Sequence, residues 1–282
     1  MTERILICTD LDRTLLPNGS APESTQARPL FSALVSRPEV MLAFVSGRHK
    51  ELVEQAIAEY QLPQPDFVIG DVGTSLYEVS ASGWQASDAW AAEIAPDWAG
   101  RDHAQLRQMF AHLPVLTLQE DAKQNRFKLS YYLAMDVATE QLLSTMRQLL
   151  NQQSIKAELI YSVDEAERVG LLDVLPASAT KFHAVEFLMK QLNLGLDDAV
   201  FAGDSGNDLP VLVSPIHSVL VANASADVRE QAKQLARRQN TESGLYLAKG
   251  GFLGMNGNYS AGILEGVAHY LPQTRQWMKT DD

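Results

Sequence analysis

The chain has 282 residues, of which 46% are hydrophobic and 21% are charged, and it carries a net charge of −12. This composition predicts a globular protein, and the length fits either one large domain or two smaller ones. The acidic balance argues against nucleic acid as a partner, because binding its phosphates requires clustered Lys and Arg.

A single cysteine, Cys8, excludes an internal disulfide and fits a reducing compartment. The residues before Asp10 are too few to form a secretory signal or a membrane span. We therefore expect a cytoplasmic protein with no membrane partner. An anionic small-molecule substrate is compatible with the acidic charge if a metal ion or a few well-placed cations supply local positive charge.

The first eighty residues alternate between apolar runs and segments of helical spacing. Residues 5–8 and 40–45 indicate strands that are buried on both faces, and residues 67–69 indicate a short third strand. One helix is expected to end near Ser36 and another to cover residues 50–60. This alternation predicts a parallel α/β sheet.

The pattern changes after about Gly83, where helices and strands follow one another in a different order. The spacing predicts helices over residues 89–98, 102–112 and 137–151, and strands over residues 115–119, 126–133 and 156–161. This grouping is typical of a separate α+β unit.

From Leu171 onward the first alternation returns, beginning with the stretch 171–175. The spacing predicts helices over residues 181–192 and 226–238 and after Asp208, and strands over residues 199–202 and 218–221. We therefore expect a parallel-sheet core formed by residues 1–82 and 173–282, interrupted by an inserted α+β cap of residues 83–172.

Two carboxylates, Asp10 and Asp12, stand where the first buried strand ends. In an extended chain, residues i and i+2 point the same way, so the two side chains are expected to converge. Open α/β sheets bind ligands at the carboxyl ends of their strands, which makes this a candidate catalytic position. A polar strand end or turn without function is the alternative for such a pair on its own.

The second strand ends in Ser46-Gly47-Arg48, which offers a hydroxyl group, unhindered backbone N–H groups and a cation. These are the parts of a small phosphate-binding site. A helix N-cap serine followed by a turn glycine explains the same residues without a function.

Two more carboxylates, Asp204 and Asp208, follow the strand predicted over residues 199–202. Lys181 begins the helix that precedes this strand, and from there its ammonium group can reach the same edge of the sheet. A solvated lysine at a helix end is the alternative.

Four pieces therefore follow one another along the chain: Asp10 with Asp12, then Ser46, then Lys181, then Asp204 with Asp208. In this order they resemble the four signature motifs of the haloacid dehalogenase (HAD) superfamily. The resemblance implies a Rossmann-like core, Mg²⁺ as cofactor, and covalent catalysis with Asp10 as nucleophile and Asp12 as acid and then base. The implied metal-site residues are Asp10, Asp12 through its backbone carbonyl, Asp204, and Asp208, which would hold a metal-bound water or the lysine. The implied phosphate-binding residues are Thr14, Ser46, Gly47, Lys181 and Asn207.

Further stretches are similar to sucrose-6-phosphate phosphatases and mannosylfructose-phosphate phosphatases, namely residues 62–66, 72–74, 128–131, 171–176 and 261–266. This resemblance implies hydrolysis of a sugar phosphate, in the first place a disaccharide phosphate such as sucrose-6-phosphate, supplied by a sugar-phosphate synthase. Mannosylfructose-phosphate or a hexose phosphate is the alternative substrate. A phosphosugar mutase and a non-catalytic module that binds sugar phosphates are alternatives of other kinds.

The cap is expected to select the sugar. We predict that Arg48 and three residues of the cap, Asn125, Lys128 and Ser130, contact it. That these are ordinary polar positions is the alternative. The six histidines show no paired spacing for zinc, and nothing in the sequence indicates an oligomeric state.

Overall fold

The computed structural model describes residues 4–165 and 167–278, and its contacts divide the chain into two compact units. The first unit combines Met1–Ala86 with Lys181–Asp282, and the second covers Ser87–Thr180. Within the described part of the chain, every helix falls short of the length and apolarity that a membrane span requires.

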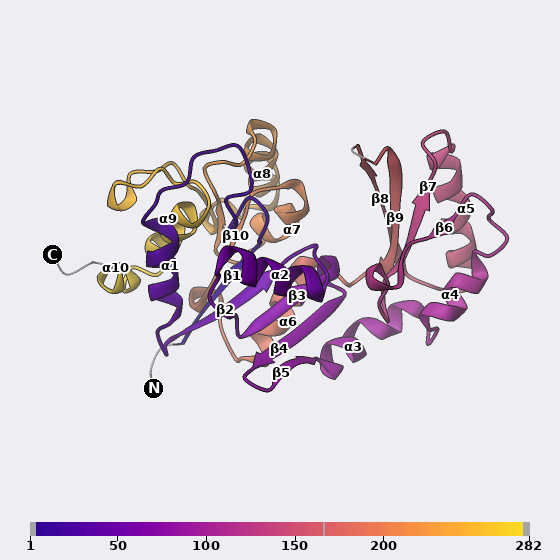
Figure 1. The fold of residues 1–282 in the computed structure, drawn as a ribbon, viewed down its shortest axis with the longest axis horizontal. Helices are drawn as coiled ribbons and strands as arrows, with labels where there is room; N and C mark the ends of the chain where they lie inside the picture. Colours follow the sequence, from indigo (N-terminus) through magenta and orange to yellow (C-terminus); the bar gives the residue numbers. More distant parts are fainter. Residues whose placement is uncertain (1–3, 166, 279–282) are drawn as a thin grey trace. The chain divides into compact units, whose positions relative to one another are not determined.

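An eight-stranded sheet runs through the first unit in the order β12-β11-β10-β1-β2-β3-β4-β5 (Figure 1). Its strands are β1 (Ile5–Thr9), β2 (Val40–Val45), β3 (Phe67–Gly70), β4 (Ser75–Ser80), β5 (Gly83–Ala86), β10 (Ala199–Gly203), β11 (Ser218–Leu220) and β12 (Leu245–Leu247). The strands from β12 to β3 are parallel, whereas β4 and β5 extend the sheet as an antiparallel hairpin. Because β1 is buried along its whole length, its apolar run can be continuous. The predicted parallel α/β core is confirmed.

Helices pack against both faces of this sheet (Figure 1). They are α1 (Ala27–Val35), α2 (Lys50–Tyr60), α6 (Lys181–Gln191), α7 (Leu209–Leu212), α8 (Ala226–Gln239), α9 (Ser260–Tyr270) and α10 (Thr274–Trp277). Apolar side chains of α1, α2 and α9, such as Phe31, Val53 and Ile263, share one buried cluster with side chains of β1 and β2. On the other face, α6 contacts β3, and α7 contacts β10 and β11.

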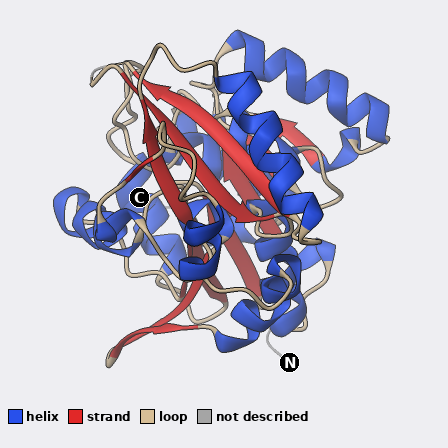
Figure 2. Ribbon diagram, turned by 90° about the vertical axis from the view of Figure 1, so that its right-hand side faces the viewer, coloured by secondary structure: helices blue, strands red, loops and turns tan. Residues whose placement is uncertain are grey.

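The second unit has its own four-stranded antiparallel sheet, in the order β6-β7-β9-β8. Its elements are α3 (Asp88–Ile94), α4 (His103–Met109), β6 (Thr117–Leu118), β7 (Leu129–Leu133), α5 (Thr139–Gln152), β8 (Ala157–Asp164) and β9 (Val169–Pro176). Helix α4 contacts β7 and helix α5 contacts β8, and both helices cover the same face of the sheet (Figures 1 and 2). The predicted α+β character of this segment is therefore observed.

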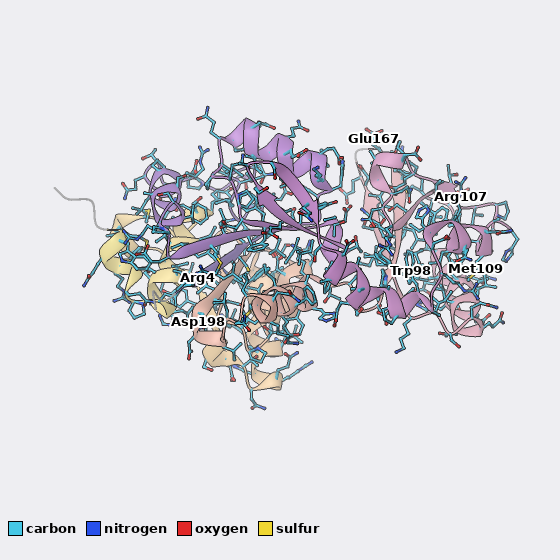
Figure 3. The ribbon with its side chains drawn as sticks, turned by 90° about the horizontal axis from the view of Figure 1, so that it is seen from below. Arg4, Trp98, Arg107, Met109, Glu167 and Asp198 are labelled. Carbon is cyan, nitrogen blue, oxygen red and sulfur yellow. The ribbon has the colours of Figure 1, made fainter. Side chains whose placement is uncertain are left out.

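Aromatic rings join the helices of the second unit to its sheet. The side chain of Trp98, labelled in Figure 3, is fully buried, and its ring meets the edge of Phe127 at a centroid distance of 5.6 Å. Phe110, which ends α4, makes a T-shaped contact with Tyr131 of β7 at 6.5 Å. Burying a ring of this size stabilises a fold by about 3 kcal/mol, so the contact of Phe110 with Tyr131 helps to fix α4 against the sheet.

Strand β9 corrects the expected domain boundary. Its stretch 171–175 is apolar except for Asp173, as in a core strand, but Leu172 and Val174 pair antiparallel with both β7 and β8. The first unit therefore resumes at Lys181 and not at residue 173. The other boundary lies at Ser87, because β5 remains paired with β4 in the large sheet.

Candidate active site

The loops that follow β1, β2 and β10 are neighbours, because β1 pairs with both of the other strands. Asp10 follows β1, Ser46 follows β2 and Asp204 follows β10, so the fold brings three predicted site residues to one edge of the sheet. The Asp10 side chain is buried, and its backbone N–H donates to the Ala202 carbonyl at 2.9 Å. This bond continues the pairing of β1 with β10 as far as the carboxylate.

Lys181 supplies a buried positive charge to this edge. Its Nζ atom donates to Asp10 Oδ1 at 2.9 Å and to Asp208 Oδ1 at 2.7 Å, and it lies 3.4 Å from Asn207 Oδ1. The lysine is only 3% exposed, so it is not the solvated helix-end residue that was the alternative. The chain therefore brings together the predicted nucleophile and three other predicted site residues.

A short 3-10 turn, Gly206–Asp208, fixes the acidic loop after β10. Asp208 Oδ2 accepts the N–H groups of Asp204 and Ser205, each at 3.1 Å. Gly203 makes room for this side chain, since a Cβ atom there would lie 2.6 Å from Asp208 Cγ. The position of Asp208 therefore depends on the absence of a side chain at residue 203.

Asp204 is held by the loop that follows the nucleophile. Thr14 Oγ1 donates to Asp204 Oδ1 at 3.3 Å, and Arg13 Nε lies 3.3 Å from Asp204 Oδ2. Thr14 is fully buried, whereas the Arg13 side chain is 58% exposed. Thr14, a predicted phosphate ligand, thus donates its hydroxyl hydrogen bond to the carboxylate of Asp204.

The buried charges shift one another's pKa values. Burial raises the pKa of Asp10 to about 7, and the charge of Asp208 adds to this while Lys181 opposes it. Burial also raises the pKa of Asp204 to about 6, against the effect of Arg13. Burial by itself would lower the pKa of Lys181, but the charges of Asp208 and Asp10 outweigh it and raise that pKa. Lys181 therefore stays protonated, whereas Asp10 and Asp204 lose their protons at a higher pH than an exposed aspartate does.

Three of these carboxylates fit a hard divalent cation. Oxygen atoms of Asp10, Asp204 and Asp208 lie within 4.8 Å of one another, and all three side chains are buried. Oxygen-only donors are the ligands that Mg²⁺ prefers, and buried carboxylates in excess of nearby cations favour a further positive charge. The Asp12 carboxylate lies outside this cluster.

The Asp12 carboxylate forms hydrogen bonds with Arg48 and Asn18 instead. Its carboxylate accepts Arg48 Nε at 2.8 Å, Arg48 Nη2 at 2.6 Å and Asn18 Nδ2 at 2.7 Å. Partial burial would raise the pKa of Asp12, but the hydrogen bonds from Arg48 and Asn18 outweigh it and lower that pKa. Arg48, predicted to contact the sugar, is therefore a bidentate partner of the predicted acid–base residue.

Ser46 and Gly47 form a tight turn at the end of β2. Ser46 is fully buried, and its Oγ accepts the Arg48 N–H at 3.2 Å. Gly47 is not crowded, because the nearest atom to an added Cβ would be Val72 Cγ2 at 3.9 Å. A phosphate oxygen can approach the backbone more closely at Gly47 than at a residue with a side chain.

The three cap residues predicted to contact the sugar lie in the second unit. Ser130 Oγ donates to Asp173 Oδ1 at 2.5 Å, and Lys128 is 9% exposed. Asn125 Oδ1 accepts the Phe127 N–H at 2.8 Å, so this end of its amide group holds a turn. Ser130 and Asn125 therefore make hydrogen bonds within the second unit, and Lys128 is largely buried there.

Sequence reasoning missed several residues that contact the site. Asn18 binds Asp12, Arg13 lies beside Asp204, and Asn223 donates to the Arg13 carbonyl at 2.6 Å. Asn18 and Asn223 are loop asparagines, which in sequence look like ordinary turn residues. The only signal for Arg13 was its place next to Asp12.

The family model for sucrose-6F-phosphate phosphohydrolase matches residues 3–271 of the chain. The chain is 50% identical to a HAD-like hydrolase of Nitrosococcus oceani, over 99% of this chain and 75% of that protein. It is 30% identical to mannosylfructose-phosphate phosphatase of Agrobacterium fabrum, over 94% of this chain and 96% of that protein. The solved structure of the sucrose-phosphatase from Synechocystis matches with a TM-score of 0.68 and 22% identity, over 95% of this chain and 98% of that one, and so shares its fold.

Proposed function

Because the chain belongs to the sucrose-6F-phosphate phosphohydrolase family of HAD phosphatases, we propose that it hydrolyses a sugar phosphate with Mg²⁺ as cofactor. Its membership makes the chain a phosphoric monoester hydrolase. The observation that carries the proposal is the buried cluster in which Lys181 joins the carboxylates of Asp10 and Asp208.

Asp10 is the proposed nucleophile. Lys181 holds its carboxylate through the bond to Oδ1, and a carboxylate in a fixed position lowers the entropic cost of attack on phosphorus. In this step a bond would form between the Asp10 carboxylate and phosphorus, and the bond from phosphorus to the sugar oxygen would break. The phosphoryl group would then be on Asp10, and the sugar would be the leaving group. A carboxylate that attacks a phosphate dianion meets like-charge repulsion, which the ammonium group of Lys181 reduces.

Mg²⁺ would be held by Asp10, Asp204 and Asp208, with the Asp12 carbonyl as a further ligand. When bound, the ion would neutralise charge on the phosphoryl oxygens. The residues of this chain then have separate tasks. Lys181 and the Gly47 N–H would contact phosphoryl oxygens, and Asn207 would add a donor beside them.

Asp12 is the proposed acid and base. It would protonate the departing sugar oxygen, and in the second step it would take a proton from the water that attacks the phosphoryl group on Asp10. The pairing with Arg48 and Asn18 lowers the pKa of Asp12, so it favours the ionised form that the second step needs. Proton donation in the first step would require this pairing to weaken when substrate binds.

The proposed substrate is a disaccharide phosphate such as sucrose-6-phosphate. The family description names this reaction, and the structural relative binds sucrose and phosphate. Mannosylfructose-phosphate is the alternative, since the Agrobacterium relative is named for it. We further propose that the second unit selects the sugar, with Lys128 and Ser130 among the contacts, and that a sugar-phosphate synthase supplies the substrate.

A panel of phosphate esters tests this proposal. Phosphate release would be measured with sucrose-6-phosphate, mannosylfructose-phosphate and hexose monophosphates, each with Mg²⁺ and with EDTA. We expect Mg²⁺-dependent release with the highest kcat/KM for a disaccharide phosphate. Turnover of monosaccharide phosphates alone would contradict the disaccharide assignment.

Two results would point to functions of other kinds. A labelled sugar phosphate that is converted to a positional isomer without phosphate release would indicate a mutase. Tight binding of a sugar phosphate without any turnover would indicate a binding module. The joint presence of Asp10, Asp12, Lys181 and Asp204 argues against a binding module, and the labelled substrate separates the hydrolase from the mutase.

A further inference from the structure

A residue in a strained backbone conformation follows the candidate acid–base residue. Arg13 has a φ of 55°, in the left-handed region that favours glycine or asparagine. The N–H groups of Thr14 and Leu16 lie 3.2 and 2.8 Å from the carbonyl oxygen of Leu11. Arg13 is therefore part of the tight turn that leads the chain away from Asp10.

Two asparagine side chains hold the peptide groups of Arg13. Asn18 Oδ1 accepts the Arg13 N–H at 2.8 Å, and Asn223 Nδ2 donates to the Arg13 carbonyl at 2.6 Å. The other end of each amide is also bonded. Asn18 Nδ2 donates to Asp12 Oδ1 at 2.7 Å, and Asn223 Oδ1 accepts the Tyr259 N–H at 2.8 Å.

Tyr259 gives this arrangement a rigid base. Its side chain is fully buried, its own φ is 51°, and its hydroxyl donates to the Ala21 carbonyl at 3.1 Å. Next to Asn223, the Ala222 N–H donates to the Gly257 carbonyl at 2.9 Å. Asn223 therefore connects the turn at Arg13 to a well-packed C-terminal segment.

We propose that Asn18 and Asn223 are positioning residues for the phosphatase reaction. Together they hold the left-handed turn at Arg13 and thereby fix Asp12 relative to Asp10. This inference rests on the proposed function, because it concerns the same two carboxylates. A displacement of about 1 Å in a catalytic group can lower a rate roughly 100-fold, so a turn under strain needs such support.

The substitution Asn223→Asp tests the donor end of the amide with almost no change in volume. The aspartate keeps an acceptor for the Tyr259 N–H, but it places an oxygen against the Arg13 carbonyl. Asn256→Asp is a matched control in the same C-terminal segment. Asn256 Oδ1 accepts the Asn258 N–H at 3.0 Å and its Nδ2 donates to the Pro22 carbonyl at 2.8 Å, so the same exchange occurs away from Arg13.

For Asn223→Asp we expect kcat to fall about 10- to 100-fold while KM changes by about twofold or less, because the loss affects the transition state. For Asn256→Asp we expect kcat within about twofold of wild type. Asn18→Ala, at an exposed residue outside the core, should lower kcat in the same way. In an Arg13→Gly background the effect of Asn223→Asp should shrink, since glycine adopts this φ without strain. Equal losses in both backgrounds, or equal losses in Asn223→Asp and Asn256→Asp, would overturn the proposal.

Hydrogen exchange gives a readout that does not depend on turnover. The amides of Thr14 and Leu16 should exchange faster in Asn223→Asp than in wild type, and at the wild-type rate in Asn256→Asp. Unchanged exchange in Asn223→Asp would overturn the proposal that Asn18 and Asn223 hold the turn at Arg13. A wild-type protein that releases no phosphate from any ester would instead refute the proposed function. Hydrogen exchange would still decide whether Asn18 and Asn223 hold the turn at Arg13.

Discussion

The ammonium nitrogen of Lys181 lies 2.9 Å from Asp10 Oδ1, although 171 residues separate the two in sequence. The same nitrogen lies 2.7 Å from Asp208 Oδ1, and all three side chains are buried. One cation therefore serves two carboxylates that follow different strands of the sheet. The whole second unit is inserted in the chain between Asp10 and Lys181.

Replacing this cation should cost stability as well as activity. Lys181→Met would leave Asp10 and Asp208 buried without their counter-charge, and we expect a loss of about 3–5 kcal/mol near neutral pH. Urea unfolding measures this difference. Lys190→Met, at an exposed position in the last turn of α6, is the control and should change stability by about 0.5 kcal/mol or less. Equal stability of the two variants would contradict the buried ion pairs.

Gly203 should tolerate no side chain. In Gly203→Ala the new Cβ would lie 2.6 Å from Asp208 Cγ, so Asp208 must move away from Lys181 and from the Asp204 N–H. We expect a loss of about 1–3 kcal/mol from overpacking, with kcat/KM reduced more than 10-fold. Gly206→Ala, where an added Cβ meets no atom within 4 Å, should retain most activity. Thermal unfolding and phosphate release distinguish the two, and a fully active Gly203→Ala would refute the placement of Asp208.

The stability of the metal-free protein should depend on pH through Asp10 and Asp204. Their pKa values rise from 3.8 to about 7 and about 6, so the folded protein binds protons more tightly than the unfolded chain. The resulting stabilisation is complete below pH 3.8 and is lost as pH rises through 6 and 7. In EDTA, the protein should therefore lose this contribution as pH rises from 3.8 to about 7. The double variant Asp10→Asn, Asp204→Asn should lack this part of the dependence, and an unchanged pH profile in it would contradict the assignment.

Protons and Mg²⁺ should compete for the same carboxylates. Because a metal ligand must be ionised, the raised pKa values of Asp10 and Asp204 predict weaker Mg²⁺ binding as pH falls through 7 and 6. Calorimetric titration at several pH values measures the affinity and the protons released. An affinity that is independent of pH over this range would show that the ion binds elsewhere.

Sequence reasoning found the strands whose composition is diagnostic. Strands β1, β2, β3 and β10 could be predicted because a parallel strand buried on both faces is a continuous apolar run. Strand β9 is also mostly apolar, interrupted by Asp173, yet it joins the antiparallel sheet of the second unit. Composition shows that such a run is buried, but it does not show which partners the strand has.

Those site residues could be predicted whose position at the edge of the sheet follows from the strand topology alone. Asp10 and Asp204 each follow a central strand, and parallel strands end at one edge. The contacts of Lys181 with Asp10 and Asp208 depended on where α6 packs, which the sequence only suggested. Asn18 and Asn223 could not be found in this way, because their role follows from the backbone angle at Arg13.

Phosphate release by Asp10→Asn is the most direct test of the proposed nucleophile. The amide is nearly isosteric and neutral, so the variant should remain folded, which circular dichroism can check. With Mg²⁺ and the best sugar phosphate of the panel, we expect release by wild type and none above background by Asp10→Asn. Release at the wild-type rate by the folded variant would contradict the assignment of Asp10.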